Sequence, residues 1–465
     1  MKGQKVFRFN KRFYTYIISI ILIICVLLSV LILSKDEKRI MLLYSPSENG
    51  AVVLSDGDLT GKTVSGKGIS KVVHNSDNTA CAVLMSDGAY YSLYTVKHNS
   101  VKKLTENGTS DFVFSFSGKK AVYATGDGQL YSGKKPVSDS VSAFAVSPDC
   151  SAVLFSKTEE NVSKLYLFSK GKVTYINEGY TPLAVSSDGK LLYVLSGDNS
   201  LFILNSDGSM QSKLCSGAYP DSFSFSSDLK RIVFSDGEYT YISEEGKSRV
   251  RLVPGVAKPV TLSGKESRLN SAGTAFVCDS KDLTEIFYVV AAADDMSDIY
   301  YVNEDFSRLD AAQSVKKYII TGKSRMTYLD NMGKIYKFDG VSELVVSGAS
   351  DLEAVSNNKY IYYMTTAKEL YSVKRSNIQI ISASVYKIYK NDDDKLFIVT
   401  TDKTLYSVSG AKKSELIASD VLSCVCDGDV VGYSTSFAGA TGTSDFYTST
   451  DGKNFSLAAS GVKKQ

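Results

Sequence analysis

The sequence predicts an all-β protein built from repeated four-stranded units, with one apolar helix in front of them. Three observations predict this fold class. A run without charge extends from Tyr14 to Leu33, a short motif recurs along the rest of the chain, and the aromatic residues are 30 Tyr and 21 Phe with no Trp. Tyr and Phe favour strands because their apolar rings pack well on a half-buried pleated surface.

The apolar run predicts a transmembrane helix over residues 14–34. At about 1.5 Å per residue, the uncharged segment is long enough to cross the roughly 30 Å hydrocarbon core of a bilayer. A cleaved signal peptide is the alternative, but no small-residue cleavage pattern follows Leu33. A lipoprotein signal at Cys25 is excluded because Ile24 precedes it and Cys25 lies in the middle of the run.

The charges around this run predict its orientation. Five basic residues and no acidic residue precede it, and the segment after it has mixed charges. The positive-inside rule then places residues 1–13 in the cytoplasm as a short tail, and the rest of the chain outside. We therefore expect a single-pass protein of the cell membrane whose main domain is extracytoplasmic.

The main domain is nearly neutral. Removing the five N-terminal charges from the 53 basic residues leaves 48, against 50 acidic residues. A protein that binds nucleic acid needs a basic surface that displaces counterions from the phosphates. The charge balance therefore argues against a nucleic-acid partner.

An internal repeat extends over the whole main domain. Leu-Tyr or a close variant recurs 35 to 41 residues apart, with one longer step from 241 to 300. The aromatic residues of this motif are Tyr94, Tyr131, Tyr166, Phe202, Tyr241, Tyr300, Tyr336, Tyr371, Tyr406 and Tyr447. A fixed period of this length is the signature of a repeat architecture.

Each repeat contains a turn between two short apolar runs. Ser147-Pro148-Asp149-Cys150 precedes one such run, and Ser187-Asp188-Gly189-Lys190 and Ser227-Asp228-Leu229-Lys230 precede others. Ser and Asp side chains bond to nearby backbone groups and so favour turns. One repeat reads as strand, turn, strand, loop, strand, turn and strand. Four short strands in about 36–40 residues match one blade of a β-propeller.

The repeats between residues 112 and 245 resemble the TolB-like β-propeller repeat, a relative of the WD-repeat blade. Ser147-Pro148-Asp149 and Ser187-Asp188-Gly189-Lys190 carry this resemblance. Later repeats, at 359–373 and 395–408, keep the strand pattern but lose the Ser-Pro-Asp-Gly turn. The resemblance implies a fold and no activity, because propellers host binding, assembly and enzymatic functions.

About ten repeats exceed the four to eight blades that are typical of one propeller. We therefore expect either two propeller-like halves, at 35–245 and 276–465, or one large ring. Residues 246–275 are then a basic linker or a long loop. Six basic residues lie in or near this stretch: Lys247, Arg249, Arg251, Lys258, Lys265 and Arg268. They could dock an anionic polymer, or they could simply be solvated.

The residue types needed for catalysis are sparse. His74 and His98 are the only histidines, and both are expected at strand ends or turns. The G-x-S-x-G nucleophile motif is absent. The Asp392–Asp394 run and Asp56-Gly57-Asp58 lack the spacing of a calcium loop and are expected in hairpin turns. Residues 449–455 are similar to the Asp-box turn of sialidase-type propellers, which is a structural element.

Six cysteines lie outside the apolar run: Cys81, Cys150, Cys215, Cys278, Cys424 and Cys426. An even number in an exported domain permits disulfides, but Cys81 and Cys278 fall in apolar strands, where a thiol packs as a small hydrophobe. We expect free structural thiols. The sequence assigns no catalytic, cofactor-binding or metal-binding residue and no cofactor.

These observations favour a non-enzymatic, membrane-anchored β-propeller that binds another envelope protein or a cell-envelope polymer. One alternative is an extracytoplasmic hydrolase or lyase with its site at the propeller centre. The other is an assembly or scaffold subunit of an envelope complex.

Overall fold

The structure is a computed structural model that describes residues 40–45, 50–55, 58–65, 68–75, 79–86, 90–97, 100–105, 108–356, 359–391, 395–427, 430–435, 444–449 and 451–462. The expected cytoplasmic tail and transmembrane helix lie outside these residues. Within them, no helix is long and apolar enough to cross a membrane. Residues 39–465 form one compact unit.

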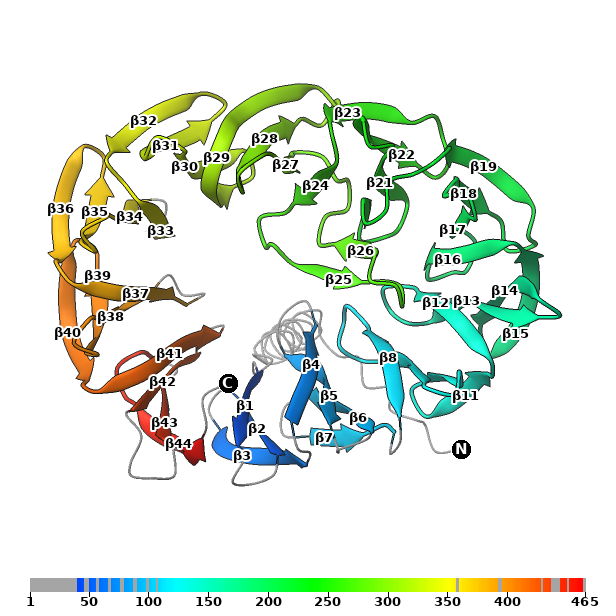
Figure 1. Ribbon diagram of the computed structural model, residues 1–465, viewed down its shortest axis with the longest axis horizontal. Coiled ribbons are helices and arrows are strands. Elements are labelled where there is room, and N and C mark those ends of the chain that lie inside the picture. Colours follow the sequence, from blue (N-terminus) through cyan, green and yellow to red (C-terminus); the bar gives the residue numbers. More distant parts are fainter. Residues whose placement is uncertain are drawn as a thin grey trace, which may run out of the picture. The chain divides into compact units, whose positions relative to one another are not determined.

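The described strands form ten sheets, seven of them four-stranded and antiparallel (Figure 1). The first three sheets contain β1 (Ile40–Ser45), β2 (Gly50–Ser55) and β3 (Asp58–Ser65); β4 (Gly68–His74), β5 (Ala80–Ser86), β6 (Tyr91–Lys97) and β7 (Ser100–Lys103); and β8 (Thr109–Phe114), β9 (Ala121–Thr125), β10 (Leu130–Ser132) and β11 (Lys135–Ser138). The next two contain β12 (Val141–Val146), β13 (Ala152–Glu159), β14 (Val162–Ser169) and β15 (Lys172–Glu178); and β16 (Tyr180–Val185), β17 (Leu192–Ser196), β18 (Leu201–Leu204) and β19 (Met210–Cys215).

Two larger sheets follow. The six-stranded sheet contains β20 (Phe223–Phe225), β21 (Arg231–Ser235), β22 (Tyr239–Glu244), β23 (Val250–Pro254), β25 (Glu266–Arg268) and β26 (Ala275–Cys278). The seven-stranded sheet contains β24 (Ala257–Val260), β27 (Ile286–Ala291), β28 (Ser297–Val302), β29 (Arg308–Gly322), β30 (Arg325–Asp330), β31 (Lys334–Asp339) and β32 (Ser342–Ser347). The long strand β29 pairs with β28 through its first half and with β30 through its second half, so it joins two blade-like units.

The last three sheets are again four-stranded. They contain β33 (Asp351–Ser356), β34 (Tyr360–Met364), β35 (Leu370–Lys374) and β36 (Asn377–Ser382); β37 (Val385–Lys390), β38 (Leu396–Thr400), β39 (Leu405–Ser409) and β40 (Lys412–Ala418); and β41 (Val421–Asp427), β42 (Val430–Thr435), β43 (Ser444–Ser449) and β44 (Ser456–Val462). Strands β1 and β3 of the first sheet lie close to β44 of the last sheet (Figure 1). The all-β fold class and its blade-like sheets are confirmed.

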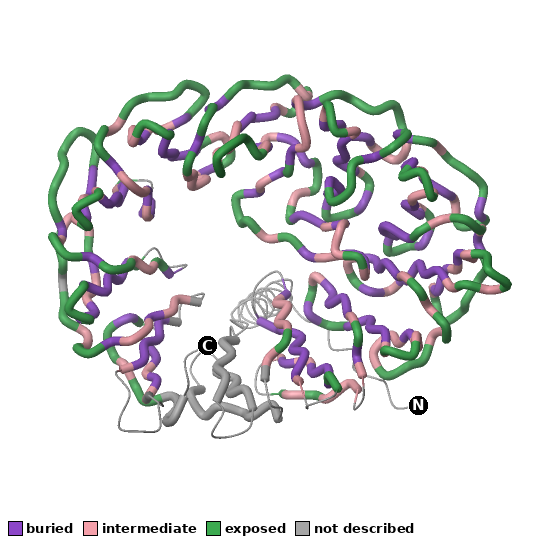
Figure 2. Tube along the Cα trace, viewed as in Figure 1, coloured by how far each residue is buried: buried purple, intermediate pink, exposed green. Residues whose placement is uncertain are grey.

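Burial follows the same pattern in several of the sheets whose side chains are described. The second strand is the most buried, as in β13 and β38, and the fourth is mostly exposed, as in β15 and β36 (Figure 2). The buried strands pack against neighbouring sheets. One apolar cluster joins the β12–β15 sheet to the β16–β19 sheet through Ala152, Leu154, Leu165, Leu167, Val185, Leu192, Val194 and Leu204. Burying each large aliphatic side chain contributes roughly 1.5–3 kcal/mol, so packing between sheets is the main source of stability.

The repeated aromatic motif has a structural cause. Each of its ten aromatic residues lies on the third strand of a blade-like unit. In six units this ring is the direct cross-strand partner of an aromatic ring on the second strand, with centroids 5.1 to 5.8 Å apart. These pairs are Tyr123–Tyr131, Phe155–Tyr166, Phe234–Tyr241, Tyr328–Tyr336, Tyr363–Tyr371 and Tyr433–Tyr447. Stacked cross-strand pairs fix the register of the two strands.

The Ser-Asp turns join the first strand of a unit to the second. Ser147 Oγ donates to Asp149 Oδ1 at 2.7 Å and accepts from the backbone N–H groups of Ser151 and Ala152. The buried hydroxyls of Ser186 and Ser226 do the same for Asp188 and Asp228. The capping serine is therefore the residue before Ser187 or Ser227.

Residues 246–275, expected as a linker or a long loop, contain strands β23, β24 and β25. Strand β23 completes the sheet of β20–β22, and β24 pairs with β27. The division of the domain into two halves around this stretch stays a prediction.

Candidate functional site

A hairpin formed by β25 and β26 is inserted between β24 and β27. Strand β26 runs parallel to β20, with Phe223 opposite Ala275 and Phe225 opposite Val277. The turn of the hairpin reaches β12, where Val146 N donates to Leu269 O at 2.7 Å and Ser271 N donates to Phe144 O at 2.8 Å. The hairpin thus connects two sheets that are far apart in the sequence (Figure 1).

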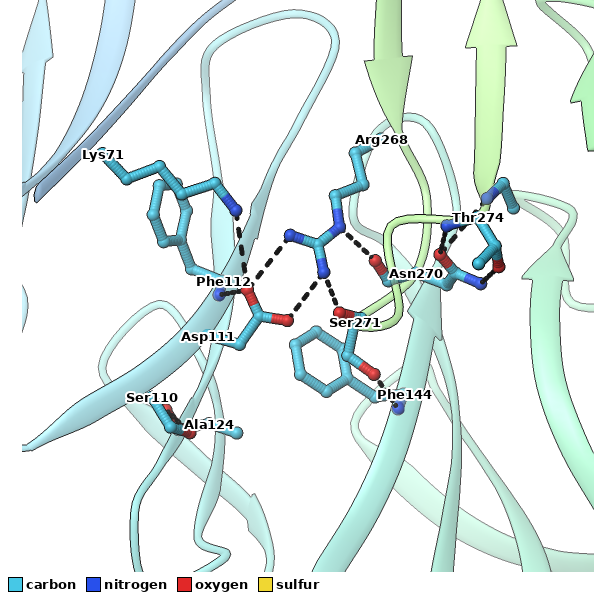
Figure 3. Close-up of polar contacts among 11 residues, drawn as sticks. Lys71, Ser110, Asp111, Phe112, Ala124, Phe144, Arg268, Asn270, Ser271 and Thr274 are labelled. Carbon is cyan, nitrogen blue, oxygen red and sulfur yellow. Dashed lines mark hydrogen bonds and ion pairs between the residues drawn. The ribbon is translucent and has the colours of Figure 1, made fainter. Parts of the chain in front are cut away.

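Arg268 of this hairpin forms a bidentate ion pair with Asp111 of β8 (Figure 3). Arg268 Nη2 lies 2.9 Å from Asp111 Oδ2, and Nη1 lies 3.2 Å from Oδ1. Arg268 Nε also donates to Asn270 O, and Nη2 donates to Ser271 O. Four of the five N–H groups of the guanidinium are bonded to partners of this chain, so the cluster acts as a structural clamp.

Lys71 lies at the edge of this clamp, with its Nζ 3.7 Å from Asp111 Oδ1 (Figure 3). Burial and the neighbouring Arg268 lower the pKa of Lys71, while Asp111 opposes that change. The two cations share one carboxylate, which makes Asp111 the centre of the cluster.

Three other residues of the basic stretch have partners in their own sheet. Lys247 Nζ is 3.6 Å from Glu244, and the guanidinium groups of Arg249 and Arg251 lie over the rings of Tyr241 and Tyr239. Lys258 and Lys265 line a cavity of about 390 Å³ together with Glu266. The six basic residues therefore do not form one positive surface.

The remaining residues singled out from the sequence have structural roles or lie outside the described residues. His74 is partly buried at the end of β4, whereas His98, Asp392–Asp394 and Asp56-Gly57 are not described. Asp451 accepts from Ser449 Oγ and from the N–H groups of Lys453 and Asn454, so the Asp-box-like segment is a turn. In the described part of the chain, no group of three or more His, Cys, Asp or Glu residues could hold a metal ion.

The expected thiols are confirmed for five cysteines. Cys150, Cys215, Cys278, Cys424 and Cys426 are free, and all but Cys426 are buried. Burial raises the pKa of Cys150 and of Cys278 to about 12. These thiols are protonated at neutral pH and pack as apolar side chains.

A pocket of about 740 Å³ lies between the β4–β7 sheet and the β8–β11 sheet. We call it the tyrosine pocket. Its lining consists of three tyrosines, four hydroxyl residues, two glycines, one carboxylate and one amide: Tyr90, Tyr91, Tyr131, Thr105, Thr109, Ser110, Thr125, Gly108, Gly126, Asp127 and Gln129. A concave surface with aromatic walls and a few polar groups is the usual form of a ligand site.

Local structure fixes the walls of this pocket. Tyr131 stacks on Tyr123 with their centroids 5.1 Å apart and an angle of 11° between the rings. Asp127 lies in the turn between β9 and β10, where its Oδ1 accepts from Thr125 Oγ1 and from Gln129 N. These two hydrogen bonds, the first above all, hold the pKa of Asp127 below its usual value, so the carboxylate is ionised at neutral pH.

Sequence reasoning did not single out the tyrosine pocket. Tyr131 was found only as part of the repeat, and Tyr90, Tyr91, Thr109 and Asp127 were not found at all. The feature of the sequence that could have indicated the pocket is the Tyr90-Tyr91 pair, which lies outside the repeat period. Tyr90 is 60% exposed and Tyr91 is 43% exposed, and the two lie side by side at the pocket.

No family model matches the sequence, and no curated protein matches it. Several solved structures are similar. The structure of a eukaryotic initiation factor has a TM-score of 0.43 and 11% identity, and the match covers 92% of this chain and 98% of that chain. Tricorn protease has a TM-score of 0.30 and 10% identity over 91% of this chain and 58% of its own.

TolB from Acinetobacter baumannii has a TM-score of 0.30 and 16% identity, and the match covers 47% of this chain and 63% of TolB. This chain therefore spans less than two thirds of either tricorn protease or TolB. Tricorn protease and TolB are propeller-type folds. At these identities and TM-scores the likeness says nothing about activity, and the description of the sheets rests on the strand order of this chain.

Proposed function

We propose that this chain is a single-pass membrane protein whose blade-like sheets form an extracytoplasmic propeller and bind a polymer of the cell envelope. The uncharged run from Tyr14 to Leu33, with five basic residues before it, supports the anchor and its orientation. The closeness of β1 and β3 to β44 supports one continuous succession of blades.

The proposed binding function rests on the tyrosine pocket. It is open, it is formed by residues of two sheets, and Tyr90 and Tyr91 are exposed beside it. Exposed tyrosines around a concave surface are typical of recognition sites, because they offer a large contact area with little loss of rotamer freedom. A polymer can lie across such a surface and place one unit in the pocket.

Protease treatment of intact cells tests the topology. We expect the blade-like domain to be degraded while a tag on residues 1–13 stays protected. If the domain resists the protease until the membrane is dissolved, the proposed orientation is wrong.

Co-sedimentation with protein-free, insoluble cell-wall polymer tests the binding function. The full chain in detergent micelles should sediment with the polymer. Tyr91→Ala should weaken sedimentation by about tenfold, since one buried aromatic contact contributes about 1.4 kcal/mol. Tyr386→Ala is the matched control, because Tyr386 is 69% exposed and lies on β37, outside the pocket. A chain that stays in the supernatant, or that sediments only when envelope proteins are present, contradicts the proposal.

A further inference from the structure

The charge of the tyrosine pocket restricts its ligand. Among the described residues, its lining includes no Lys, Arg or His, and Asp127 is its one acidic residue. A polymer with phosphate or carboxylate groups would meet this carboxylate without any cation to balance it, which is unfavourable in a partly enclosed site. The described lining therefore disfavours an anionic ligand.

The aromatic walls suit a flat apolar face. Tyr131 is held in place by its stacking on Tyr123, and Tyr90 and Tyr91 are exposed beside the same cavity. The C–H face of a pyranose ring can pack on such rings, while the hydroxyl groups at its edge remain available for hydrogen bonds. A purely apolar ligand would leave the polar groups of the pocket without partners.

The lining of the pocket also includes a residue with a buried hydroxyl group. Thr109 is 1% exposed and lines the cavity, and among the described residues its Oγ1 has no hydrogen-bond partner. An unsatisfied buried hydroxyl costs about 1–3 kcal/mol, so native proteins seldom retain one without a reason. Thr109 Oγ1 is not accessible from the cavity, so a sugar hydroxyl would satisfy it only once the Thr109 side chain turns toward the ligand. The exposed carboxylate of Asp127 would accept from a second sugar hydroxyl directly.

From these three observations we propose that the tyrosine pocket binds one pyranose unit of an uncharged glycan. Tyr90, Tyr91 and Tyr131 provide the apolar contact, while Thr109 and Asp127 provide the hydrogen bonds. This proposal rests on the proposed function and specifies its ligand. It also places binding away from the basic stretch of residues 247–268.

Calorimetric titration of the full chain in detergent micelles tests the proposal. The probes are hexamers of β-1,4-linked glucose and of β-1,4-linked N-acetylglucosamine, and a β-1,4-linked glucuronic acid hexamer is the anionic counterpart. We expect at least one neutral hexamer to bind with a dissociation constant below about 1 mM, and the anionic hexamer to bind at least about tenfold more weakly.

Variants locate the site. Tyr91→Ala should weaken binding of the neutral hexamer about tenfold, and Tyr386→Ala should not change it. Thr109→Val should weaken binding about threefold but leave the unfolding midpoint unchanged or higher, because it removes an unsatisfied hydroxyl. A purely structural role for Thr109 would instead lower the midpoint and leave binding unchanged.

The failures of the two proposals are distinguishable. Suppose that the chain sediments with cell-wall polymer but binds only the anionic hexamer, or none of the three hexamers. The inference is then overturned and the polymer-binding function stands. A Tyr91→Ala variant that binds the neutral hexamer as the wild type does also overturns it. If the pocket binds a proline-rich peptide and no saccharide, the inference and the polymer-binding function are both wrong.

Discussion

Two regions of the domain connect their sheets in different ways. In the serine-turn region (β8–β23), the turns around Asp149 and Asp188 are linked by short polar side chains, in addition to a bond from Tyr193 OH to Leu229 O. Ser187 Oγ donates to Asp149 Oδ1 at 2.9 Å, and Ser151 Oγ donates to Ser187 O at 3.0 Å. In the C-terminal region (β33–β44), Lys390 Nζ donates to Val355 O at 3.3 Å and Tyr362 OH donates to Gly410 O at 2.8 Å.

The two regions share one kind of contact between sheets and differ in another. Apolar contacts join the sheets in both regions, whereas the polar contacts between sheets differ. Both regions have apolar clusters that span neighbouring sheets, such as the cluster of β12–β19 and the cluster of β38–β42. The serine-turn region adds hydrogen bonds between turns, and the β25–β26 hairpin clamps it through Arg268 and Asp111. Short side chains lose little rotamer freedom when they are fixed, whereas an exposed lysine loses much. We therefore expect polar contacts to stabilise the serine-turn region more.

The largest effect is expected at the clamp. Arg268→Ala leaves Asp111 with the backbone N–H of Phe112 and the more distant Lys71. Both partners of the broken pair are largely buried, with 20% and 25% of their side chains exposed. Breaking such a pair should lower the free energy of unfolding by about 2 kcal/mol, less than for a fully buried pair. Urea unfolding measures this change, and hydrogen exchange should show faster exchange in β8 and β25.

Lys247→Ala is the control for the clamp, because it removes an exposed ion pair from the same basic stretch. It should cost less than about 0.5 kcal/mol. A double-mutant cycle of Arg268→Ala with Asp111→Ala should give a coupling energy above about 1 kcal/mol. Equal effects of Arg268→Ala and Lys247→Ala would show that the hairpin is not clamped.

The second effect concerns the turn caps. Ser186→Ala removes a buried hydroxyl that accepts from Leu191 N at 3.0 Å and from Lys190 N at 3.2 Å. It should cost about 1–2 kcal/mol in urea unfolding, as for other capping hydroxyls. Ser187→Ala, one residue later, alters only an exposed contact and should cost about 0.5 kcal/mol.

In the C-terminal region the corresponding cap is Asn391, whose Oδ1 accepts from Lys395 N at 2.8 Å. Among the described residues its buried Nδ2 has no partner, so Asn391→Ala should cost less than Ser186→Ala. The reverse order would contradict the expected difference between the two regions.

The third effect depends on pH. Burial opposes ionisation of Asp149, but hydrogen bonds from Ser147, Ser151 and Ser187 outweigh it and hold the pKa of Asp149 below its usual value of 3.8. A lowered carboxyl pKa means that the stabilisation is present above pH 3.8 and is lost as the pH falls through the folded pKa. Asp149→Asn should therefore cost about 0.5–1 kcal/mol at neutral pH.

Urea unfolding of the wild type and of Asp149→Asn between pH 6 and about pH 2.5 tests this expectation. The two stabilities should begin to converge as the pH falls below about 3.8 and should meet once it is below the lowered pKa of folded Asp149, because the protonated wild-type carboxyl then resembles the amide. In the C-terminal region, the hydrogen bonds of Asp402 come from Thr400 and Thr404 of its own turn, so acid should loosen that turn without separating sheets there. A constant difference across this pH range would contradict the role of the Asp149 carboxylate.

The sequence predicts those parts of this structure that local chemistry determines. The tyrosines of the third strands recur with a fixed period because each stacks on its cross-strand neighbour, as Tyr131 does on Tyr123. The Ser-Asp turns are visible for the same reason, since Ser147 bonds to residues within five positions. In two of the turns, the serine that caps the turn lies one residue before the serine singled out in the sequence.

Contacts between distant segments could not be predicted in this way. Asp111 and Arg268 are 157 positions apart, and an ion pair leaves no periodic pattern in one sequence. The parallel pairing of β20 with β26 departs from the antiparallel rule of every other described pair in that sheet. The tyrosine pocket forms where two sheets pack together. The sequence alone therefore does not indicate that Tyr91 and Thr109 line the same pocket.

The smallest effect is expected where lysines connect sheets. Lys317 Nζ lies 2.9 Å from Asp351 Oδ1 and joins β29 to β33, with 40% and 42% of the two side chains exposed. Lys317→Ala should lower the free energy of unfolding by less than about 0.5 kcal/mol, because water screens the pair and the side chain regains its rotamers. In 1 M NaCl this small difference should vanish, since the screening length falls to about 3 Å. The loss caused by Arg268→Ala should persist in the same salt, because its pair is shielded from solvent and includes hydrogen bonds to backbone oxygens. If both losses disappear in salt, the clamp is a surface ion pair, and the two regions are held together in the same way.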